Sequence, residues 1–548
     1  MTSIKLVKGA NSASPAERLA SLLDTADPKL SVQALSLLDF AHLALALGPE
    51  SSSELLILAS QKQFKTLLDI DAWDRDRVNL KRVHKWIDAM SQADNMGMAK
   101  GFLSLDPELA GFILLKEIKL YVEGEDQDPG EGHVLHPTPD PRVFVEIMLD
   151  GEEHERVLKM LDEIYSLNPA AAVRTLLSIR AALPSELEEQ ALQWRCARME
   201  DLGFPPMEEA LDVYAKPGSD HVAHYDPVEG SDLSYLPGFY ADRLSPDELI
   251  SRALDGMDGR QSTAITQQLV SLFNRILTAD RIKLSDQRST LKKIATALDT
   301  ITLGLEVLGA RDGETASRIL LDQGVKEVFR FGYRQGAELA ERARRLKRIG
   351  LLGGTEPGEL HESPVPQVMS ALLSSRPKFS RRLDEPAVTG IRPFKTLYDV
   401  ERTKQILDQA EAAALLVHRV IGFSGKAIRS MAEETGKAPS LANAFRTAFV
   451  RRAIGFETFD LEILEVSQVN EFRKACISME SGRPEMNQKT AAWMESSLDS
   501  LKMPLPEELQ EHVSRLAGKW ITDLLEELGS IPNNMELDPR YIGLLFVA

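Results

Sequence analysis

The chain has 548 residues, too many for one hydrophobic core, so two to four domains or one long helical array are expected. Its formal charge of −19 opposes binding to nucleic acid and to anionic lipid, and two cysteines, Cys196 and Cys476, make no disulfide framework. Aromatic residues make up only 6% of the chain, whereas Ala, Leu, Glu and Arg are abundant, which favours helices over sheets. We predict an all-α protein, a multi-block helical array with stacked helix pairs and at most a minor β element.

The beginning of the chain has no apolar signal region, and no run approaches the roughly 20 apolar residues of a membrane span. We therefore expect a cytoplasmic protein that binds no membrane, no nucleic acid and no cofactor. Composition divides the chain into blocks. In order these are a disordered tail 1–13, an N-terminal helical block 14–123, an acidic linker or loop 124–141, a second helical block 142–215, a loop 216–244, a central helical block with a long helix 245–350, a Pro- and Gly-containing connector 351–393 and a C-terminal helical block 394–548.

Helix-start signals recur along the chain. In a capping box a serine hydroxyl accepts a free backbone N–H, and the carboxylate three residues later reaches back to the serine N–H. Four pairs fit this spacing: Ser14 with Glu17, Ser51 with Glu54, Ser185 with Glu188, and Ser245 with Glu248. One segment alternates with period two, Arg142–Leu149, where Val143, Val145 and Ile147 share a face and predict a strand.

A weak internal repeat is also present. Ser104-Leu105-Asp106-Pro107 and Ser166-Leu167-Asn168-Pro169 each predict a helix with Asp or Asn as cap and Pro at the first position. Asp27-Pro28 is a third, degraded copy on this reading. A true repeat would indicate stacked helix pairs, with Leu114 in the core of one pair. Asp-Pro also starts ordinary helices, so both explanations stay open.

One run of residues reads Trp194-Arg195-Cys196-Ala197-Arg198-Met199-Glu200-Asp201-Leu202-Gly203-Phe204-Pro205, followed by Glu208, Glu209, Ala210, Leu211 and Tyr214. This run is similar to the signature of an uncharacterised bacterial family of unknown function and of about this length. The similarity extends upstream to 68–73 and downstream to 329–333 and 392–394. This resemblance implies no activity and no functional residue.

The first block also resembles the helical N-domains of MgtE-type magnesium transporters and of flagellar motor switch proteins, through its Leu-Asp-Pro-Glu-Leu-Ala helix start at 105–110. This second resemblance is short. It implies helical stacking and not transport.

Few residues suggest chemistry. The Gly422–Ala427 run lacks the glycine spacing and the Ser or Thr of a phosphate-binding loop. Two His-x-x-His pairs lie near carboxylates in loops, His133 with His136 and His221 with His224. Such spacing suits Zn²⁺ or Mn²⁺, although a solvated polar loop whose histidines bind no metal is the simpler explanation. Arg195 and Arg198 lie on one helix before Gly203, as either an anion-binding site or a structural ion pair.

The most distinctive surface is a helix predicted from Asp322 to Ile349. Its apolar stripe consists of Val325, Val328, Phe329, Gly332, Gly336, Leu339, Ala340, Ala343, Leu346 and Ile349. Its other face carries Arg330, Arg334, Arg342, Arg344, Arg345, Lys347 and Arg348. Pairs of Glu338 with Arg342 and of Glu341 with Arg345, together with the helix dipole, would account for these cations. The alternative is that Arg344, Arg345, Lys347 and Arg348 dock an acidic partner or the chain's own 124–141 loop.

Two functions follow from these observations. The first is a non-catalytic interaction or scaffold protein that binds other proteins, and it is the one that we favour over an enzyme. The second is a metal-dependent hydrolase with a loop-borne site at His221 and His224.

Overall fold

A computed structural model describes residues 14–127, 130, 132–180, 182–218, 240, 248–348, 358–480, 483–488, 490–493, 496, 507–531 and 537–548. The chain divides into two compact units, Met1–Arg330 and Phe331–Ala548, and the boundary falls within the long helix α18 (Val325–Arg348). Most of the described residues are helical and the strands form only small antiparallel sheets, which confirms the predicted all-α class. No helix in the described ranges is long and apolar enough to cross a membrane.

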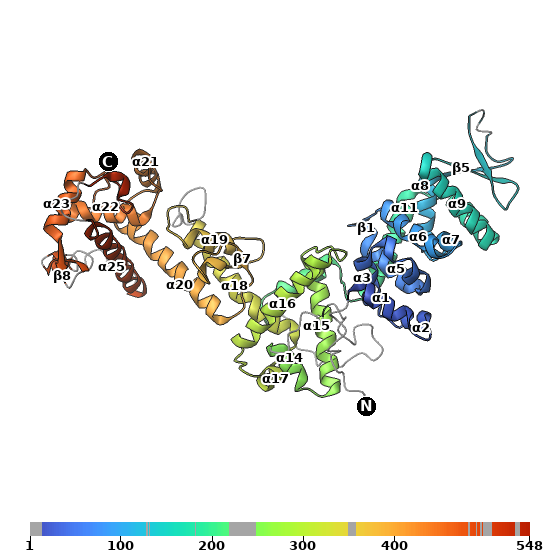
Figure 1. Cartoon of the computed structure of the whole chain (residues 1–548), viewed down its shortest axis with the longest axis horizontal. Helices are drawn as coiled ribbons and strands as arrows, with labels where there is room; N and C mark the ends of the chain where they lie inside the picture. The colour runs from blue at the N-terminus through green and yellow to red at the C-terminus, as the bar shows by residue number, and fades with distance from the viewer. Residues whose placement is uncertain are drawn as a thin grey trace. The chain divides into compact units, whose positions relative to one another are not determined.

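The first unit begins with short helices that pack on one another in pairs such as α3 with α5 and α6 with α7 (Figure 1). Their bounds are α1 (Pro15–Leu23), α2 (Pro28–Gln33), α3 (Leu37–Leu47), η1 (Pro49–Ser51), α4 (Ser53–Leu58), α5 (Gln61–Asp71), α6 (Leu80–Ala93), α7 (Gly97–Leu103) and α8 (Pro107–Glu117), with a β1–β2 hairpin at Trp73–Asp74 and Arg77–Val78. The Ser14 capping box is confirmed, because Ser14 accepts from the Glu17 N–H and Glu17 accepts from the Ser14 N–H at 2.6 Å. Leu114 is 2% exposed, as a core residue should be.

A three-stranded sheet follows α8. Its strands are β3 (Ile118–Val122), β4 (Leu135–Pro137) and β5 (Val143–Ile147), in the order β3-β5-β4. The predicted strand is therefore confirmed as β5, and Val143, Val145 and Ile147 are all buried. Period-two alternation identified this strand because one face of the sheet meets the protein core.

The described residues that follow β5 in the first unit are mostly helical. Its elements are α9 (Gly151–Leu167), α10 (Pro169–Ile179), α11 (Pro184–Asp201), α12 (Met207–Ala210), η2 (Leu211–Tyr214), α14 (Leu249–Asp255), α15 (Gly259–Ala279), α16 (Gln287–Val307), α17 (Gly313–Gln323) and the first turns of α18. Helix α11 packs on α8, and α14 packs along α17. Of the two cysteines, Cys196 on α11 is exposed, whereas Cys476 in the second unit is buried.

Two predicted capping boxes are wrong. Helix α4 begins one residue after Ser52, whose hydroxyl donates to the carbonyl oxygens of Ala44 and Gly48 instead of capping the helix. Helix α11 begins at Pro184, before Ser185, and Glu188 accepts a hydrogen bond from the Val78 N–H. The proline fixes the first helical turn without a hydroxyl cap. Ser245 lies outside the described residues.

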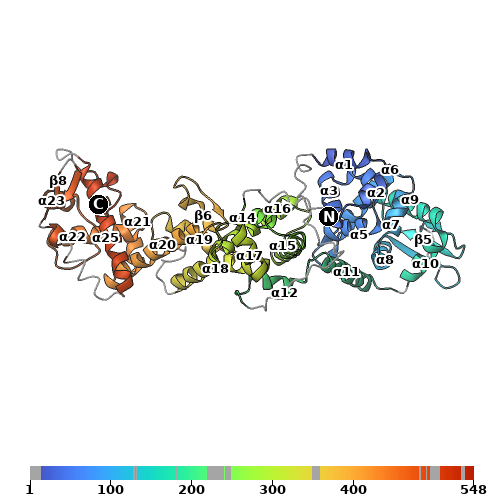
Figure 2. The same cartoon turned by 90° about the horizontal axis from the view of Figure 1, so that it is seen from below.

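The second unit continues α18 and then passes from α19 along α20 to α22 and α25, as both views show (Figure 1, Figure 2). Its elements are α19 (Val365–Leu372), β6 (Phe379–Ser380), η3 (Arg381–Leu383), β7 (Ile391–Arg392), α20 (Leu397–Ala414), a π-helical segment (Leu415–Val420), α21 (Gly425–Thr435), α22 (Leu441–Ala453), α23 (Val466–Cys476), β8 (Ile477–Glu480), β9 (Arg483–Met486), α25 (Glu507–Gly529) and η5 (Pro539–Tyr541). Its core includes the rings of Phe445, Phe449 and Phe472, with Trp520 of α25 against Phe445.

Candidate functional site

The arginine pair on α11 is surrounded by carboxylates of other helices. Arg198 donates from Nε and Nη2 to the two carboxylate oxygens of Asp69 on α5, at 2.7 and 2.9 Å. Its Nη1 lies 2.7 Å from Asp106 Oδ2, at the start of α8. Lys65 forms a further ion pair with Asp106 at 2.6 Å. Together Lys65, Asp69, Asp106 and Arg198 form a network that we call the Arg198 hub.

The electrostatics of the hub are those of a buried network. Burial raises the pKa of the Asp69 carboxyl, although hydrogen bonds from Arg198 act in the opposite direction. Burial lowers the pKa of Arg198, but its hydrogen bonds and its attraction to Asp69 and Asp106 together raise it above the ordinary value. Arg195 donates to the Asp69 carbonyl oxygen at 2.8 Å and lies over the Trp73 ring. These contacts suffice for a structural role, and an anion site at Arg195 and Arg198 stays a prediction.

The two predicted repeat copies differ in how their caps are used. Helices α8 and α10 begin at Pro107 and Pro169, as predicted. Asn168 caps α10 by accepting a hydrogen bond from the Ala171 N–H at 3.0 Å. Asp106 occupies the same position before α8 but makes no side-chain cap bond, because its carboxylate binds Lys65 and Arg198. The same sequence signal therefore starts both helices, while only one carboxylate serves the hub.

The long helix α18 begins and ends within three residues of the prediction. Val325, Val328, Leu339, Ala340, Ala343 and Leu346 of its apolar stripe are buried. A Cβ on Gly336 would lie 3.1 Å from the Phe394 ring, so a glycine is needed for this close packing.

The prediction that Arg330 lies on the exposed face of α18 is wrong. Its side chain is fully buried, where it pairs with Glu327 and with Asp212 Oδ1 at 2.9 Å. Arg330 falls on the buried side because a charged side chain can be covered when carboxylates of its own and a neighbouring segment pair with it. Helical periodicity alone does not report such partners.

The remaining cations of α18 fall into two groups. Arg334 pairs with Glu338 at 2.8 Å and with Glu341 at 3.6 Å. Arg342 pairs with Asp408 and Glu411 of α20, each at 2.5 Å. Glu338 and Glu341, which were predicted to pair with Arg342 and Arg345, therefore pair with Arg334 instead.

The last turn of α18 carries the second group, which we call the α18 tip: Arg344, Arg345, Lys347 and Arg348. All four side chains are exposed. Within the part of the chain that the structure describes, we find no carboxylate in ion-pair contact with any of them. The helix dipole favours cations at this end, but its effect is at most about 1 kcal/mol per exposed charge and does not neutralise four of them.

The histidine pairs give no metal centre in the described ranges, where no group of three or more His, Cys, Asp or Glu residues is placed to hold a metal ion. His221 and His224 lie outside these ranges. His133 Nδ1 lies 2.5 Å from Glu146 Oε1, and the ring of His136 lies 5.4 Å from that of His154. The contact with His133, a hydrogen bond from Tyr121 and the charge of Lys119 hold the pKa of Glu146 below its usual range, although burial opposes them.

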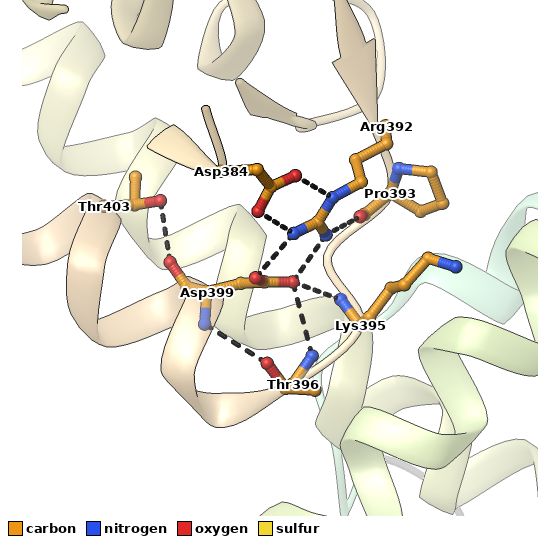
Figure 3. Close-up of polar contacts among 7 residues, drawn as sticks. All are labelled: Asp384, Arg392, Pro393, Lys395, Thr396, Asp399 and Thr403. Atoms are coloured by element: carbon orange, nitrogen blue, oxygen red, sulfur yellow. Dashed lines mark hydrogen bonds and ion pairs between the residues drawn. The ribbon is translucent and has the colours of Figure 1, made fainter. Parts of the chain in front are cut away.

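A second arginine hub lies in the second unit, between β7 and the start of α20 (Figure 3). Arg392 donates from Nε and Nη2 to Asp384, both at 2.9 Å, and from Nη1 and Nη2 to Asp399, at 2.6 and 2.8 Å. Asp399 also accepts the N–H of Lys395 at 2.8 Å, while the Arg392 guanidinium lies 4.0 Å from the Phe379 ring centre. The hydrogen bond from Arg392 holds the pKa of Asp384 below its usual range. We call this network the Arg392 hub.

A buried titratable cluster lies where α6, α8 and α9 meet. Glu117, 3% exposed, lies 2.6 Å from His84 Nε2 and 3.0 Å from Arg156 Nη2. Burial raises the pKa of the Glu117 carboxyl, but His84 and Arg156 outweigh it and hold this pKa below the ordinary value. Burial raises the pKa of nearby Asp88. Such clusters occur in functional sites and in structural networks alike.

A shallow pocket of about 350 Å³ opens near this cluster. It is lined by Asn95, Met96, Glu155, Leu158, Lys159, Asp162, Glu163 and Ser166. Glu163 also accepts the Ala99 N–H in the first turn of α7, at 3.1 Å. With three carboxylates and one lysine in its lining, the pocket attracts cations and repels phosphates.

Comparison with known families decides the relationship of the chain. Residues 5–548 match the model of a family of unknown function, DUF6178. The chain belongs to this family. No curated protein and no solved structure matches the chain. The family resemblance predicted from the Trp194–Pro205 run is thereby confirmed, and membership of DUF6178 assigns neither an activity nor a site.

Sequence reasoning identified Arg195 and Arg198 in this member of the family, but it missed both their partners and the Glu117 cluster. His84 and Asp88 lie four residues apart on α6, a spacing that places both on one helix face. That was the only local signal, because Glu117 and Arg156 come from elements much later in the chain.

Proposed function

We propose that the protein is a cytoplasmic, non-catalytic scaffold that binds other proteins, and that the α18 tip contacts an acidic partner protein. The observation that carries the proposal is the contrast along one helix. Arg330, Arg334 and Arg342 all pair with carboxylates, whereas the four cations of the tip are exposed without an ion pair among the described residues.

The charge balance of the chain supports this contrast. In a chain of net charge −19, solubility does not require four cations within five residues. Like charges so close together repel one another, and an acidic partner relieves that repulsion on binding. A partner held this way associates quickly at low salt and dissociates more readily as salt rises.

The chain's own 124–141 loop is the weaker candidate for this contact. Arg180 already pairs with Glu125 and, at 2.9 Å, with Asp126 in that loop. Asp126 also accepts the Val122 N–H at 2.7 Å. Two of its carboxylates are thus engaged locally, which favours a separate acidic protein.

The test is charge reversal of the tip in the full chain, with Arg344, Arg345, Lys347 and Arg348 all changed to Glu. The matched control reverses Lys404, Lys426, Lys474 and Lys519, which are exposed lysines of the same unit. Both variants change the net charge by the same amount. Proteins captured from the native cell are identified by mass spectrometry, and each purified partner is then titrated at about 50 and about 300 mM salt.

We expect the tip variant to lose an acidic partner that the control variant retains, at an unchanged melting temperature. The measured affinity should fall at the higher salt for the unaltered chain. Equal partner sets for the two variants would refute the proposal. So would tighter binding of the tip to a DNA duplex than to poly-L-glutamate, because that result would make the tip a nucleic-acid contact.

A further inference from the structure

A second binding feature, separate from the α18 tip, lies in the second unit, where the segment 542–548 runs beside α22 and α25 (Figure 2). Ile542, Leu545, Phe546 and Val547 are each at most 2% exposed. Tyr541, directly before them, is 79% exposed. The segment therefore places four apolar side chains in the core while its neighbour remains in solvent.

The main chain of this segment is held largely by side chains of the surrounding elements. Lys437 Nζ donates to the carbonyl oxygens of Ile542, at 2.6 Å, and of Leu545. Glu527 on α25 accepts the N–H groups of Gly543 and Leu544, at 2.8 and 3.2 Å.

Helix α22 and the strand-like residue Leu464 complete these contacts. Asn443 donates to the Gly543 carbonyl oxygen at 3.1 Å, and Thr447 accepts the Phe546 N–H at 3.0 Å. Leu464 pairs with the segment as a parallel strand, through bonds of 2.9 Å to the Phe546 carbonyl oxygen and 3.0 Å from the Ala548 N–H.

These contacts are of the kind by which a groove binds an extended peptide. A cation that binds carbonyl oxygens and a carboxylate that binds N–H groups recognise main-chain atoms, which every extended peptide possesses. Selectivity then comes from the buried apolar positions and from one glycine. A Cβ at position 543 would lie 3.2 Å from Glu527 Oε1, so a side chain is disfavoured there.

We propose that Lys437, Asn443, Thr447, Leu464 and Glu527 form a groove for an extended apolar segment of a partner protein, and that residues 542–548 are its resident competitor. The partner segment carries the pattern of the resident one: an apolar residue, glycine, any residue, and then three apolar residues. Because the resident segment is tethered at an effective concentration in the millimolar range, a partner must compete with it, and the groove is autoinhibited in the isolated chain.

The experiment separates the resident segment after folding. A protease recognition sequence is inserted within 532–536 of the full chain, and the folded protein is cleaved. A fluorescent peptide with the sequence of residues 537–548 is then added, and its binding is followed by anisotropy. Control peptides carry Phe546→Asp, at a buried position, or Leu544→Asp, at a half-buried one. The protein variants are Lys437→Met and, as a matched control, Lys426→Met at an exposed lysine.

We expect the labelled peptide to replace the cleaved segment with one peptide bound per chain. Binding should weaken at least about tenfold for Lys437→Met and for the Phe546→Asp peptide, because each loses buried contacts worth more than about 1.4 kcal/mol. Lys426→Met and the Leu544→Asp peptide should change it little. Failure of the peptide to exchange, or exchange only when α22 and α25 unfold, would overturn the proposal and make the segment a structural strap.

Hydrogen exchange on the uncleaved chain gives an independent test, in case cleavage perturbs the fold. The amides of Phe546 and Ala548 should exchange faster than those within α22, through an opening that leaves the helix intact. Equal protection would overturn the proposal. A dimer formed by exchange of the 542–548 segments would overturn the assignment to a different partner, because the occupant would then be a second copy of the chain.

Discussion

The Arg198 and Arg392 hubs share one arrangement, a guanidinium between two aspartates, yet they connect the chain over different ranges. Arg198 is 129 residues from Asp69 and joins α11 to α5 and to the start of α8. Arg392 is 8 residues from Asp384 and 7 from Asp399, so it fixes one local segment before α20. The comparison teaches that the same ion-pair geometry can hold a whole unit together or only shape a loop.

The hubs also differ in what remains when the arginine is removed. The Asp69 side chain is 4% exposed, and its ion pair is with Arg198. Asp399 is 5% exposed but also accepts main-chain N–H groups of Lys395 and Thr396, and Asp384 is 43% exposed to solvent. Loss of Arg198 therefore leaves the buried Asp69 carboxylate without its ion-pair partner. Loss of Arg392 leaves Asp399 with its main-chain donors and Asp384 in contact with solvent.

The largest expected effect is that of Arg198→Met. It leaves Asp69 buried without its partner, which costs about 3–5 kcal/mol of the unfolding free energy of the first unit. Urea unfolding, followed by hydrogen exchange in peptides of α5, α8 and α11, measures it. Arg195→Met should cost only about 1–2 kcal/mol, since it loses one hydrogen bond to a carbonyl and the contact with the Trp73 ring. Similar costs for the two variants would show that the hub does not hold the unit.

Acid should lower the stability of the first unit through His42, a residue outside the Arg198 hub. Burial lowers the pKa of His42 on α3 to about 3, so the folded chain keeps it neutral while the unfolded chain is protonated below about pH 6.5. The stability present above pH 6.5 is therefore lost as pH falls, by about 2 kcal/mol at pH 5. Unfolding of α3, followed by hydrogen exchange from pH 7 to 5, should show this loss. The His42→Leu variant should lose this part of the pH dependence, and an unchanged slope would contradict the assignment.

The effect of Arg392→Met should be smaller and local. Asp399 keeps its main-chain donors and Asp384 turns to water, so the cost is the hydrogen bonds and the contact with Phe379, about 1–2 kcal/mol. Faster hydrogen exchange should be confined to residues 377–403. Arg402→Met, which loses a contact with the exposed Tyr398 ring and a minor charge interaction with Asp384, should leave exchange nearly unchanged. Loosening that spreads to α22 would show that this hub, too, acts over a long range.

Local signals predicted much of the fold. The Ser14 box, the starts of α8 and α10, the strand β5 and the length of α18 depend on neighbouring residues, and all are found as expected. Ser51 and Ser185 show the limit of these signals. A serine at cap spacing does not cap a helix when the helix starts at another residue.

Side-chain pairs between residues far apart in the chain could not be predicted from the sequence. Nothing near Arg198 indicates Asp69, and nothing near Arg330 indicates that Asp212 will pair with its buried guanidinium. The main-chain contacts of Lys437 with the 542–548 segment depend on a similar separation of about 105 residues. Pairing at such distances is set by tertiary packing, which periodicity and capping do not encode.

The smallest expected effect comes from Asp106→Asn, and it asks which carboxylate carries the Arg198 hub. The amide oxygen of asparagine can still accept from Arg198 or from Lys65, and Asp69 keeps its two hydrogen bonds from Arg198. Asparagine is also a good helix cap, so the start of α8 gains what Asn168 supplies to α10. We expect a loss of about 0.5–1 kcal/mol in urea unfolding, similar to the about 1 kcal/mol of Asn168→Ala. A loss as large as that of Arg198→Met would mean that the charge of Asp106, rather than the buried pair with Asp69, holds the three helices together.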